Sequence, residues 1–523
     1  MSKRSHTQLQ STIDPDDHPI HKSRSPPFRR SVTLDDIGEF EDAWEDEIEE
    51  EHVAQNPTND PDRMQVDDGE EEDSIETIVE DDEDETHSRH PETDTFIPGR
   101  HLLEKDEILE PDDSVYEIRH SMQVKWPSLS FDVLRDNLGD QRQRYPATAY
   151  IVAGTQAPSA KDNELSVYKM SALHKTQNDG GDSDSDDEDD ADALDEDPLL
   201  EFRSVPHFGG VNRVRAQPLP PSTPLPPVSH PYYVSTWAET GKVHIWDVRP
   251  LIESLDTPGF THEKNRTNSP VFTITSHARA EGFAMDWASS GDSNPSALRL
   301  LTGDVHSKIY LTTTGQAGFN ALPQPFTTHT SSVEDLQWSP SEPPVFASCS
   351  ADQSVQIWDV RIRGKRSAAG IDRAHGSDVN VISWNKLTPY LLLSGGDEGQ
   401  IKAWDLRNIK KKGSAGSDPT PVASFDWHRA PVTSIEWHPT EDSIFAASGA
   451  DDQVTLWDLA VEQDDDETID GAGGPNEQAI PPQLLFVHQG QKDVKEVHWH
   501  PQIPGAVIST ALDGFNIFKT ISV

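Results

Sequence analysis

The stretch SCSADQSVQIWDVR, residues 348–361, recurs with changes along the second half of the chain. It begins with small residues, passes through a polar turn, and then alternates apolar and polar residues up to a Trp-Asp pair. Alternation of period two beside a short polar turn predicts a β-hairpin. Three further stretches keep this order of residue types, at 236–249, 394–407 and 448–460. We therefore expect the chain to stack several copies of one small unit.

Each unit also opens on a second recurring phrase that begins with His. The clear copies start at His329, His375, His428 and His488, and a weaker copy covers 276–288. Degenerate hairpin endings complete the set at 163–170, 303–313 and 512–520. About seven units then lie between residues 120 and 523, with a period of 46 to 53 residues where no insertion intervenes. Each unit is long enough for four short strands.

This pattern resembles the WD-repeat family, and the resemblance implies an all-β fold, a seven-bladed WD-repeat β-propeller. The polar network of that family can be placed on one unit, with His329 as the network His, Ser348 or Ser350 as the strand hydroxyl, Asp352 as the turn carboxylate and Trp358 as the indole donor. A buried indole N–H needs an acceptor, and a His held between a hydroxyl and a carboxylate keeps one tautomer. We assign these residues a structural role and no catalytic one.

The ring is expected to close with both ends of the chain. SMQVKWPSLSFDVL, residues 121–134, looks like a strand that lies far from the hairpin of its own unit. We predict that it supplies the outer strand of the last blade, which ends with GFNIFKTISV at 514–523. Closure of this kind leaves no exposed sheet edge at the seam.

The segments around the propeller divide the chain. We expect an acidic disordered tail over 1–95, a linker and an N-terminal helix over 96–120, and the propeller over 121–523. Acidic loops interrupt the propeller at 175–201 and 461–480. The predicted helix begins near Val115, with Asp112, Asp113 or Ser114 as its cap.

The charge of the chain is concentrated in blocks. The formal net charge is −50, of which about −26 lies within 31–95, −13 within 179–201 and −6 within 462–470. Acidic blocks attract basic partners and raise their encounter rate. Neutralising nucleic-acid phosphates needs clustered Lys and Arg, so this balance argues against direct DNA or RNA binding.

The tail carries an apolar pattern among its carboxylates. Within DDIGEFEDAWEDEIEEE, residues 35–51, Phe40, Trp44 and Ile48 follow one another at helical spacing. Two interpretations stay open: an amphipathic segment that folds on a partner, or a solvated acidic tail with incidental aromatic residues.

Other features limit the class of protein. Cys349 is the only cysteine, so no disulfide is expected, which suits a reducing compartment. We find no apolar run long enough for a transmembrane helix and no secretory signal. Catalytic and phosphate-binding motifs are also missing, so we expect a monomeric protein that is not an enzyme and has no cofactor. His498 and His500 hint at metal ligands, but a related WHP at 437–439 favours a structural role and no metal site.

The flanks of the repeats resemble the glutamate-rich WD-repeat proteins. The resemblance rests on FEDAWEDEIEEE near the N-terminus, on TFIPGRHLLEKDEILEPDDSVYEIRHSMQVKWPSLSFDVLRDNLGD from residue 95, and on PPQLLFVHQGQKDVKEVHWHPQIPGAVISTALDGFNIF from residue 481. It covers nearly the whole chain beyond about residue 31. It implies a nuclear and nucleolar chaperone of large-subunit (60S) ribosome biogenesis that binds a ribosomal protein of the L-three type and meets pre-ribosomal factors.

The retinoblastoma-associated histone-binding WD proteins are a related branch. In that branch a helix before the propeller and an acidic loop ending in Pro-Pro form a groove for a basic histone helix. The matching positions here are Asp112, Asp113 and Glu117 in the predicted helix, and Glu462, Asp464, Asp465, Asp466, Glu467 and Asp470 before Pro481-Pro482. The sequence ends at Val523 without a C-terminal helix, which we expect to weaken the histone interpretation.

The central acidic loop offers a second basic-partner surface and candidate modification sites. Its partner-binding candidates are Asp186, Asp187, Glu188, Asp189 and Asp190. Ser183 and Ser185 lie among these carboxylates, as in sites of casein kinase two, and phosphorylation would add negative charge. A loop that only keeps the protein soluble would have the same composition.

A different class of function is also compatible with the repeats. Arg249, Arg361 and Arg407 follow a Trp-Asp pair by two residues, a pattern seen in substrate receptors of cullin-four ubiquitin ligases. These arginines are candidate adaptor-binding residues, although an Arg at this position can equally neutralise a local carboxylate. Basic stretches at 22–30 and 408–413 are weak candidates for nuclear import signals.

Overall fold

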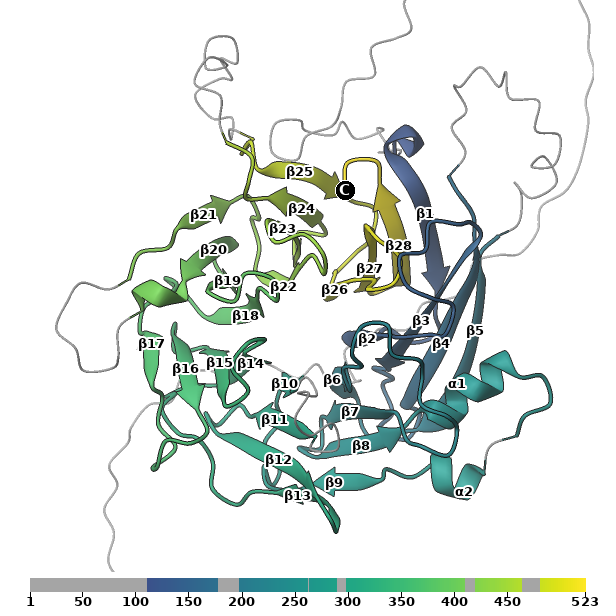
Figure 1. Cartoon of the computed structure of the whole chain (residues 1–523), viewed down its shortest axis with the longest axis horizontal. Coiled ribbons are helices and arrows are strands. Elements are labelled where there is room, and N and C mark those ends of the chain that lie inside the picture. Colours follow the sequence, from purple (N-terminus) through teal and green to yellow (C-terminus); the bar gives the residue numbers. More distant parts are fainter. Residues whose placement is uncertain (1–110, 177–196, 262, 289–297, 410–418, 463–479) are drawn as a thin grey trace, which may run out of the picture. The chain divides into compact units, whose positions relative to one another are not determined.

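A computed structural model describes residues 111–176, 197–261, 263–288, 298–409, 419–462 and 480–523. These residues form seven four-stranded antiparallel sheets arranged as the blades of a ring (Figure 1). The innermost strand of each blade contacts the innermost strands of both neighbouring blades, including the last blade with the first. The predicted all-β, seven-bladed propeller is therefore confirmed.

The first four blades follow one another along the chain, and their strands are named a to d from the inside outward. Blade 1 contains β2 (Ser130–Leu134), β3 (Ala147–Gly154), β4 (Glu164–Leu173) and β5 (Leu199–Pro206). Blade 2 contains β6 (Val211–Ala216), β7 (Tyr233–Ala238), β8 (Val243–Asp247) and β9 (Phe272–Ile274). Blade 3 contains β10 (Ala284–Trp287), β11 (Arg299–Gly303), β12 (Ile309–Gly315) and β13 (Gly318–Ala321). Blade 4 contains β14 (Val333–Trp338), β15 (Val345–Ser350), β16 (Val355–Asp359) and β17 (Ala369–Ile371).

The last three blades include the seam of the ring. Blade 5 contains β18 (Val379–Trp384), β19 (Leu391–Gly396), β20 (Gln400–Asp405) and β21 (Ala423–Asp426), with a 3₁₀ turn η2 (Leu406–Asn408) after β20. Blade 6 contains β22 (Val432–Trp437), β23 (Ile444–Gly449), β24 (Val454–Asp458) and β25 (Leu484–His488). Blade 7 contains β26 (Glu496–Trp499), β27 (Ala506–Ala511), β28 (Gly514–Thr520) and, as its outer strand, β1 (Tyr116–Gln123).

The antiparallel order sorts the connections between strands onto two faces. Strands a and c run in one direction and strands b and d in the other, so the a–b and c–d connections open on the same face of the ring. We call this side the loop face. Two helices, α1 (Arg249–Asp256) and α2 (Lys264–Thr267), belong to the c–d connection of blade 2. A proline in its first turn favours the start of α1, whose Leu251, Ile252 and Leu255 pack on the core of blades 1 and 2.

The outer strand at the seam corrects two predictions. The helix predicted near Val115 is not present there, because Asp113–Val115 form only a 3₁₀ turn, η1, and β1 follows directly. The strand predicted over 121–134 is also wrong as a unit, since its first residues end β1 and its last residues form β2 in blade 1. Closure itself occurs as expected, with β1 paired antiparallel to β28.

The predicted polar network is confirmed in blade 4. The indole Nε1 of Trp358 donates to Ser348 Oγ at 2.7 Å, and this hydroxyl lies 2.6 Å from Nε2 of His329. Nδ1 of His329 donates to the carboxylate of Asp352 at 2.9 Å. Ser348, and not Ser350, is therefore the network hydroxyl. The network leaves no donor without an acceptor, which is what its burial requires.

Neighbouring blades vary this network without losing its chemistry. In blade 5 a glutamate replaces the turn aspartate, and His375 donates to Glu398 at 2.7 Å. In blade 6 the hydroxyl comes from Thr455, which accepts the Trp457 indole at 2.7 Å and lies 3.0 Å from His428. The varied hairpins thus preserve a hydroxyl and a carboxylate around the imidazole.

We expect Trp358→Ala to destabilise the propeller by about 3–5 kcal/mol, because it empties a buried aromatic site and removes the donor to Ser348. Trp358 is fully buried, and its ring stacks on Phe346 at a centroid distance of 5.7 Å. Trp358→Phe keeps most of this packing and removes only the N–H, so its loss should be near 1 kcal/mol. Urea unfolding of both variants measures the difference, and equal stability of the two would exclude the packing argument.

Side chains on the inner strands tie each blade to the next. At most junctions a side chain of one blade accepts a backbone N–H of its neighbour. The pairs are Asp132–Ala216, Asp286–Trp338, Asp335–Ile382, Ser383–Trp437, Glu436–Trp499 and Glu496–Phe131. Between blades 2 and 3 the direction is reversed, and the Arg213 guanidinium donates to the Phe283 carbonyl. Buried charge in the centre of the ring therefore has a structural function.

Candidate partner-binding site

Three acidic segments leave the loop face from three consecutive blades. Residues 177–196, with eleven carboxylates and no Lys or Arg, connect β4 to β5 in blade 1. Residues 463–479, with six carboxylates and no Lys or Arg, connect β24 to β25 in blade 6. The N-terminal segment joins blade 7 between them through β1. We call the described ends of these three segments the acidic rim.

The N-terminal segment touches the root of the central acidic loop. The backbone N–H of Thr176 donates to the carbonyl of Glu117 at 3.0 Å, and Nε2 of His120 donates to the carbonyl of His174 at 2.8 Å. These bonds join the residues that directly precede 177–196 to β1. The central acidic loop therefore starts beside the outer strand of blade 7.

The same segment touches the root of the second acidic loop on its other side. Tyr116 packs edge-on against Phe486 with ring centroids 5.3 Å apart, and its hydroxyl is hydrogen-bonded to Nδ1 of His488 at 2.8 Å. Burial raises the pKa of Tyr116, and burial together with the nearby Arg119 lowers the pKa of His488 to about 3. Both rings are thus neutral at physiological pH and fix β25 against β1. β1 holds the roots of both acidic loops.

The described carboxylates of the predicted site already have local partners. Asp112 accepts from the backbone N–H of Ser114 and so caps η1, as a capping residue should. Asp113 accepts from Arg119 at 2.8 Å, and Glu117 pairs with Lys519 at 2.6 Å. Glu462 is exposed. The structure brings the first three together at one end of β1, although on a turn and a strand instead of the predicted helix.

The remaining site candidates lie outside the described residues. They are Asp186, Asp187, Glu188, Asp189 and Asp190, the serines Ser183 and Ser185, and Asp464, Asp465, Asp466, Glu467 and Asp470. The tail over 1–95 lies outside them as well. One boundary is corrected: the loop predicted over 175–201 ends earlier, because β5 already begins at Leu199.

The three candidate adaptor-binding arginines differ in accessibility. Arg249 is only 6% exposed and is held by the carbonyl of Pro226 and the carboxylate of Glu253. Arg361 and Arg407 are exposed, and each forms a bidentate pair with the Asp two residues before it. Arg249 therefore lacks a free surface, whereas the other two lie on the loop face with their charge partly neutralised.

His498 and His500 take structural positions. Nδ1 of His498 donates to Glu436 at 3.0 Å, and Nδ1 of His500 accepts the backbone N–H groups of Gln502 and Ile503. Burial alone would lower the pKa of His498, but Glu436 and Glu496 outweigh it and raise that pKa to about 10. Among the described residues no group of three His, Cys, Asp or Glu side chains is arranged to hold a metal ion.

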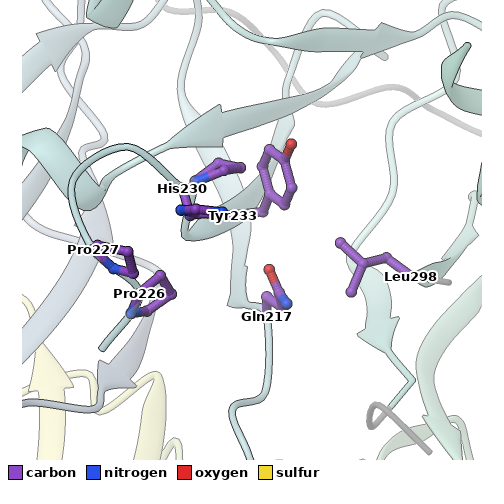
Figure 2. A pocket seen from close by; sticks show the side chains of 7 residues that line it. Gln217, Pro226, Pro227, His230, Tyr233 and Leu298 are labelled. Carbon is purple, nitrogen blue, oxygen red and sulfur yellow. The ribbon is translucent and has the colours of Figure 1, made fainter. Parts of the chain in front are cut away.

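A separate apolar pocket of about 450 Å³ opens on blades 2 and 3. Figure 2 shows Pro226 and Pro227 on one side of it and Leu298 on the other, with Tyr233 and His230 between them. Its proline-rich wall is the a–b connection of blade 2, which the repeat pattern did not reveal as a pocket. With few polar groups it offers van der Waals contact and no catalytic chemistry. No helix in the described part of the chain is long and apolar enough to cross a membrane.

Comparison with known proteins agrees with the repeat and with its flanks. The family model of the WD domain, G-beta repeat, matches residues 321–359, 369–405 and 419–458, which correspond to blades 4, 5 and 6. A second family model, described as histone-binding protein RBBP4 or its counterpart in the CAF1 complex, matches residues 106–174. That match includes the whole of β1 and ends at the root of the central acidic loop.

The similarity to curated relatives extends over nearly the whole chain. Ribosome assembly protein rrb1 of Schizosaccharomyces pombe is 46% identical over 96% of this chain and 97% of its own length. Glutamate-rich WD repeat-containing protein 1 of Dictyostelium discoideum is 44% identical over 80% of this chain and 83% of its own length. The chain belongs to the glutamate-rich WD-repeat family. Another relative, protein HEAT STRESS TOLERANT DWD 1 of Arabidopsis thaliana, is 42% identical over 82% of this chain and 92% of its own length.

Proposed function

We propose that this chain is a non-enzymatic assembly factor of the large ribosomal subunit that acts in the nucleus and nucleolus. It binds a basic ribosomal protein of the L-three type and shields its charge until ribosomal RNA replaces the acidic surface. The 46% identity to a relative named as a ribosome assembly protein supports the process. The acidic rim supports the class of partner.

One observation carries the proposal. β1 is hydrogen-bonded to the root of one acidic loop through Thr176 and packed on the root of the other through Phe486. Seventeen carboxylates in the two loops therefore leave the same face of the ring on either side of the N-terminal segment. Charge of one sign gathered over a rigid scaffold steers a basic segment and raises its local concentration.

We expect that neutralising Asp464, Asp465, Asp466 and Glu467 to Asn and Gln slows association with the ribosomal protein by about tenfold at low salt. The salt dependence of the association rate should flatten, because long-range steering falls with ionic strength. Deleting 182–197 should change affinity less, since a loop that becomes ordered on binding loses conformational entropy. Stopped-flow association at two ionic strengths measures all three proteins.

A matched control removes the same number of charges from the opposite face. Asp162, Glu239, Glu281 and Asp397 are exposed on the connections opposite the loop face, and their neutral variant should associate like wild type. If the loop variant and this control behave alike at both ionic strengths, the partner binds elsewhere. The clamp between blades 6, 7 and 1 would then be wrong.

A histone is the second candidate partner. The match of residues 106–174 to the histone-binding family model favours it, because these residues include β1 and the Tyr116 contact with β25. Competition decides between the two: the ribosomal protein should displace core histones at equal concentration. Displacement in the opposite direction would favour a chromatin function.

The cullin-four adaptor remains a third proposal and rests on Arg361 and Arg407 alone, since Arg249 is buried. Co-purification of a cullin-four adaptor, lost in the double variant Arg361→Ala and Arg407→Ala, would support it. Binding of the ribosomal protein should be unchanged in that variant, because both arginines lie on blades 4 and 5.

A further inference from the structure

Basic side chains gather on blades 4 and 5 of the loop face. Arg361, Arg363 and Arg366 lie in the c–d connection of blade 4, between β16 and β17. Lys386 lies in the a–b connection of blade 5, and Arg407 directly follows β20. We call these five residues the basic rim. Three connections that are separate in sequence thus bring five cations to one part of a chain whose net charge is −50.

The two blades are packed together where this rim lies. Leu406 and Ile409, on either side of Arg407, pack in one cluster with Val345 and Ile357 of blade 4. In the same junction the backbone N–H of Trp384 donates to the side chain of Gln337, and Lys386 follows two residues later. The basic rim is therefore one continuous surface on rigid strands.

Much of this charge is available to a ligand. Arg361 and Arg407 are paired with Asp359 and Asp405, although their side chains remain 68% and 65% exposed. Arg363, Arg366 and Lys386 are exposed and form no hydrogen bond or ion pair with any residue that the structure describes. The sequence adds Lys410, Lys411 and Lys412 a few residues after Arg407. A patch with this many exposed cations fits a polyanion.

An aromatic side chain stands within the patch. The Arg407 guanidinium lies 3.8 Å from the ring centroid of Tyr390, and Tyr390 is 40% exposed. Leu387, beside Lys386, is 50% exposed. Exposed aromatic rings among Arg and Lys are the arrangement that proteins use to stack the bases of single-stranded nucleic acid while cations follow its phosphates.

We propose that the basic rim binds single-stranded RNA, with Arg363, Arg366 and Lys386 on the phosphates and Tyr390 stacked on a base. The acidic composition argued against nucleic acid, but composition averages over the chain, and charges are screened beyond about 8 Å at physiological ionic strength. An acidic protein segment would satisfy the cations equally well. It would make no particular use of the Tyr390 and Arg407 pair, and this favours RNA.

The inference rests on the basic rim and does not require the proposed ribosomal function. It also differs from the adaptor proposal, because its central residues are not those of the Trp-Asp-x-Arg pattern. If both hold, the protein contacts a basic protein on blades 6, 7 and 1 and RNA on blades 4 and 5. Such a protein would carry its partner next to the RNA that must receive it.

Fluorescence anisotropy with labelled oligouridine and the full chain tests the proposal. Wild type should bind with micromolar affinity at low salt, and the affinity should fall steeply as salt is added. The double variant Arg363→Glu and Arg366→Glu should bind at least about tenfold more weakly, with a log–log salt slope smaller by about 1 to 2, as expected for the loss of two phosphate contacts. Unchanged affinity in this variant, or no salt-dependent binding by wild type, would overturn the proposal.

Two further measurements separate RNA from other ligands. Tyr390→Leu keeps an apolar side chain but removes the stacking ring, so it should weaken oligouridine binding about fivefold or more and leave polyglutamate binding unchanged. Equal loss for both probes, or polyglutamate binding as tight as RNA, would instead identify an acidic protein as the ligand. Arg363→Glu with Arg366→Glu should still bind the basic ribosomal protein, so failure here and failure of the proposed function are distinguishable.

Discussion

A chain that begins at Val124, and therefore lacks β1, should fail to form a stable propeller. β1 is the outer strand of blade 7 and pairs with β28 over its whole length, from Tyr116 to Gln123. Its Tyr116, Ile118 and Met122 are buried. Loss of three such side chains costs about 5 kcal/mol or more at roughly 1.5–3 kcal/mol each, which is comparable with the whole stability of many domains.

The exposed edge adds a second penalty. Without β1, the backbone groups of β28 lose their partners, and the apolar cluster around Phe515 and Ile517 is uncovered. An unpaired, apolar sheet edge is a site of aggregation. Size-exclusion chromatography and thermal unfolding should show a soluble, cooperative protein for a chain starting at Asp112 and aggregates for one starting at Val124. Cooperative unfolding of the shorter chain near the wild-type temperature would contradict the role of β1 in closure.

The position of β1 also shows where sequence reasoning failed. Asp112, Asp113 and Ser114 are good helix caps, and Asp112 does cap a turn, so the local signal for a helix start was real. The chain continues from this turn as a strand, because Tyr116, Ile118 and Met122 alternate and meet β28 from the other end of the sequence. The alternation was visible in the sequence. The partner strand, almost 400 residues away, decided which periodicity won.

The propeller itself was predictable because its signals are local and repeated. Trp358, Ser348 and Asp352 lie within one hairpin, and the same residue types return in the next two blades. The acidic rim and the basic rim were not predictable in the same way. The contact of Thr176 with Glu117, and the proximity of Arg363 to Arg407, depend on blade order and on nonlocal packing. A pattern within one unit contains no information about which connections share a face.

The seam between blades 7 and 1 leads to a second large effect. Glu496 is almost fully buried, and its carboxylate pairs with Arg213 and Arg215 at 2.8 Å each. It also accepts the backbone N–H of Phe131 across the seam at 2.8 Å. Burial would raise the pKa of Glu496, but Arg215, His498 and Arg213 hold it well below its usual range. Glu496 is thus a buried anion on which three cationic side chains depend.

We expect Glu496→Ala to destabilise the propeller by about 3–5 kcal/mol, because it leaves buried cations without a counter-charge and one backbone donor without an acceptor. Glu496→Gln retains an acceptor for Phe131 and should cost less. A matched control is Glu436→Gln at the neighbouring junction, which also binds His498 but does not contact Arg213 or Arg215. Urea unfolding at pH 7 should rank the variants in this order, and wild-type stability of Glu496→Ala would refute the dependence of the seam on this carboxylate.

The pH dependence of these variants gives an independent test of the same cluster. The pKa of His498 is raised to about 10 in the folded protein, above its unfolded value near 6.5, so the folded state binds the proton more tightly. The stability that this proton contributes is complete below about pH 6.5 and is lost as the pH rises toward 10. Removing the charge of Glu496 takes away one of the two carboxylates that hold the proton, and the loss should then begin and end at lower pH. Unfolding free energies of wild type and Glu496→Gln between pH 6 and 10 should therefore diverge first in the lower half of that range, and parallel curves would show that His498 does not titrate with this cluster.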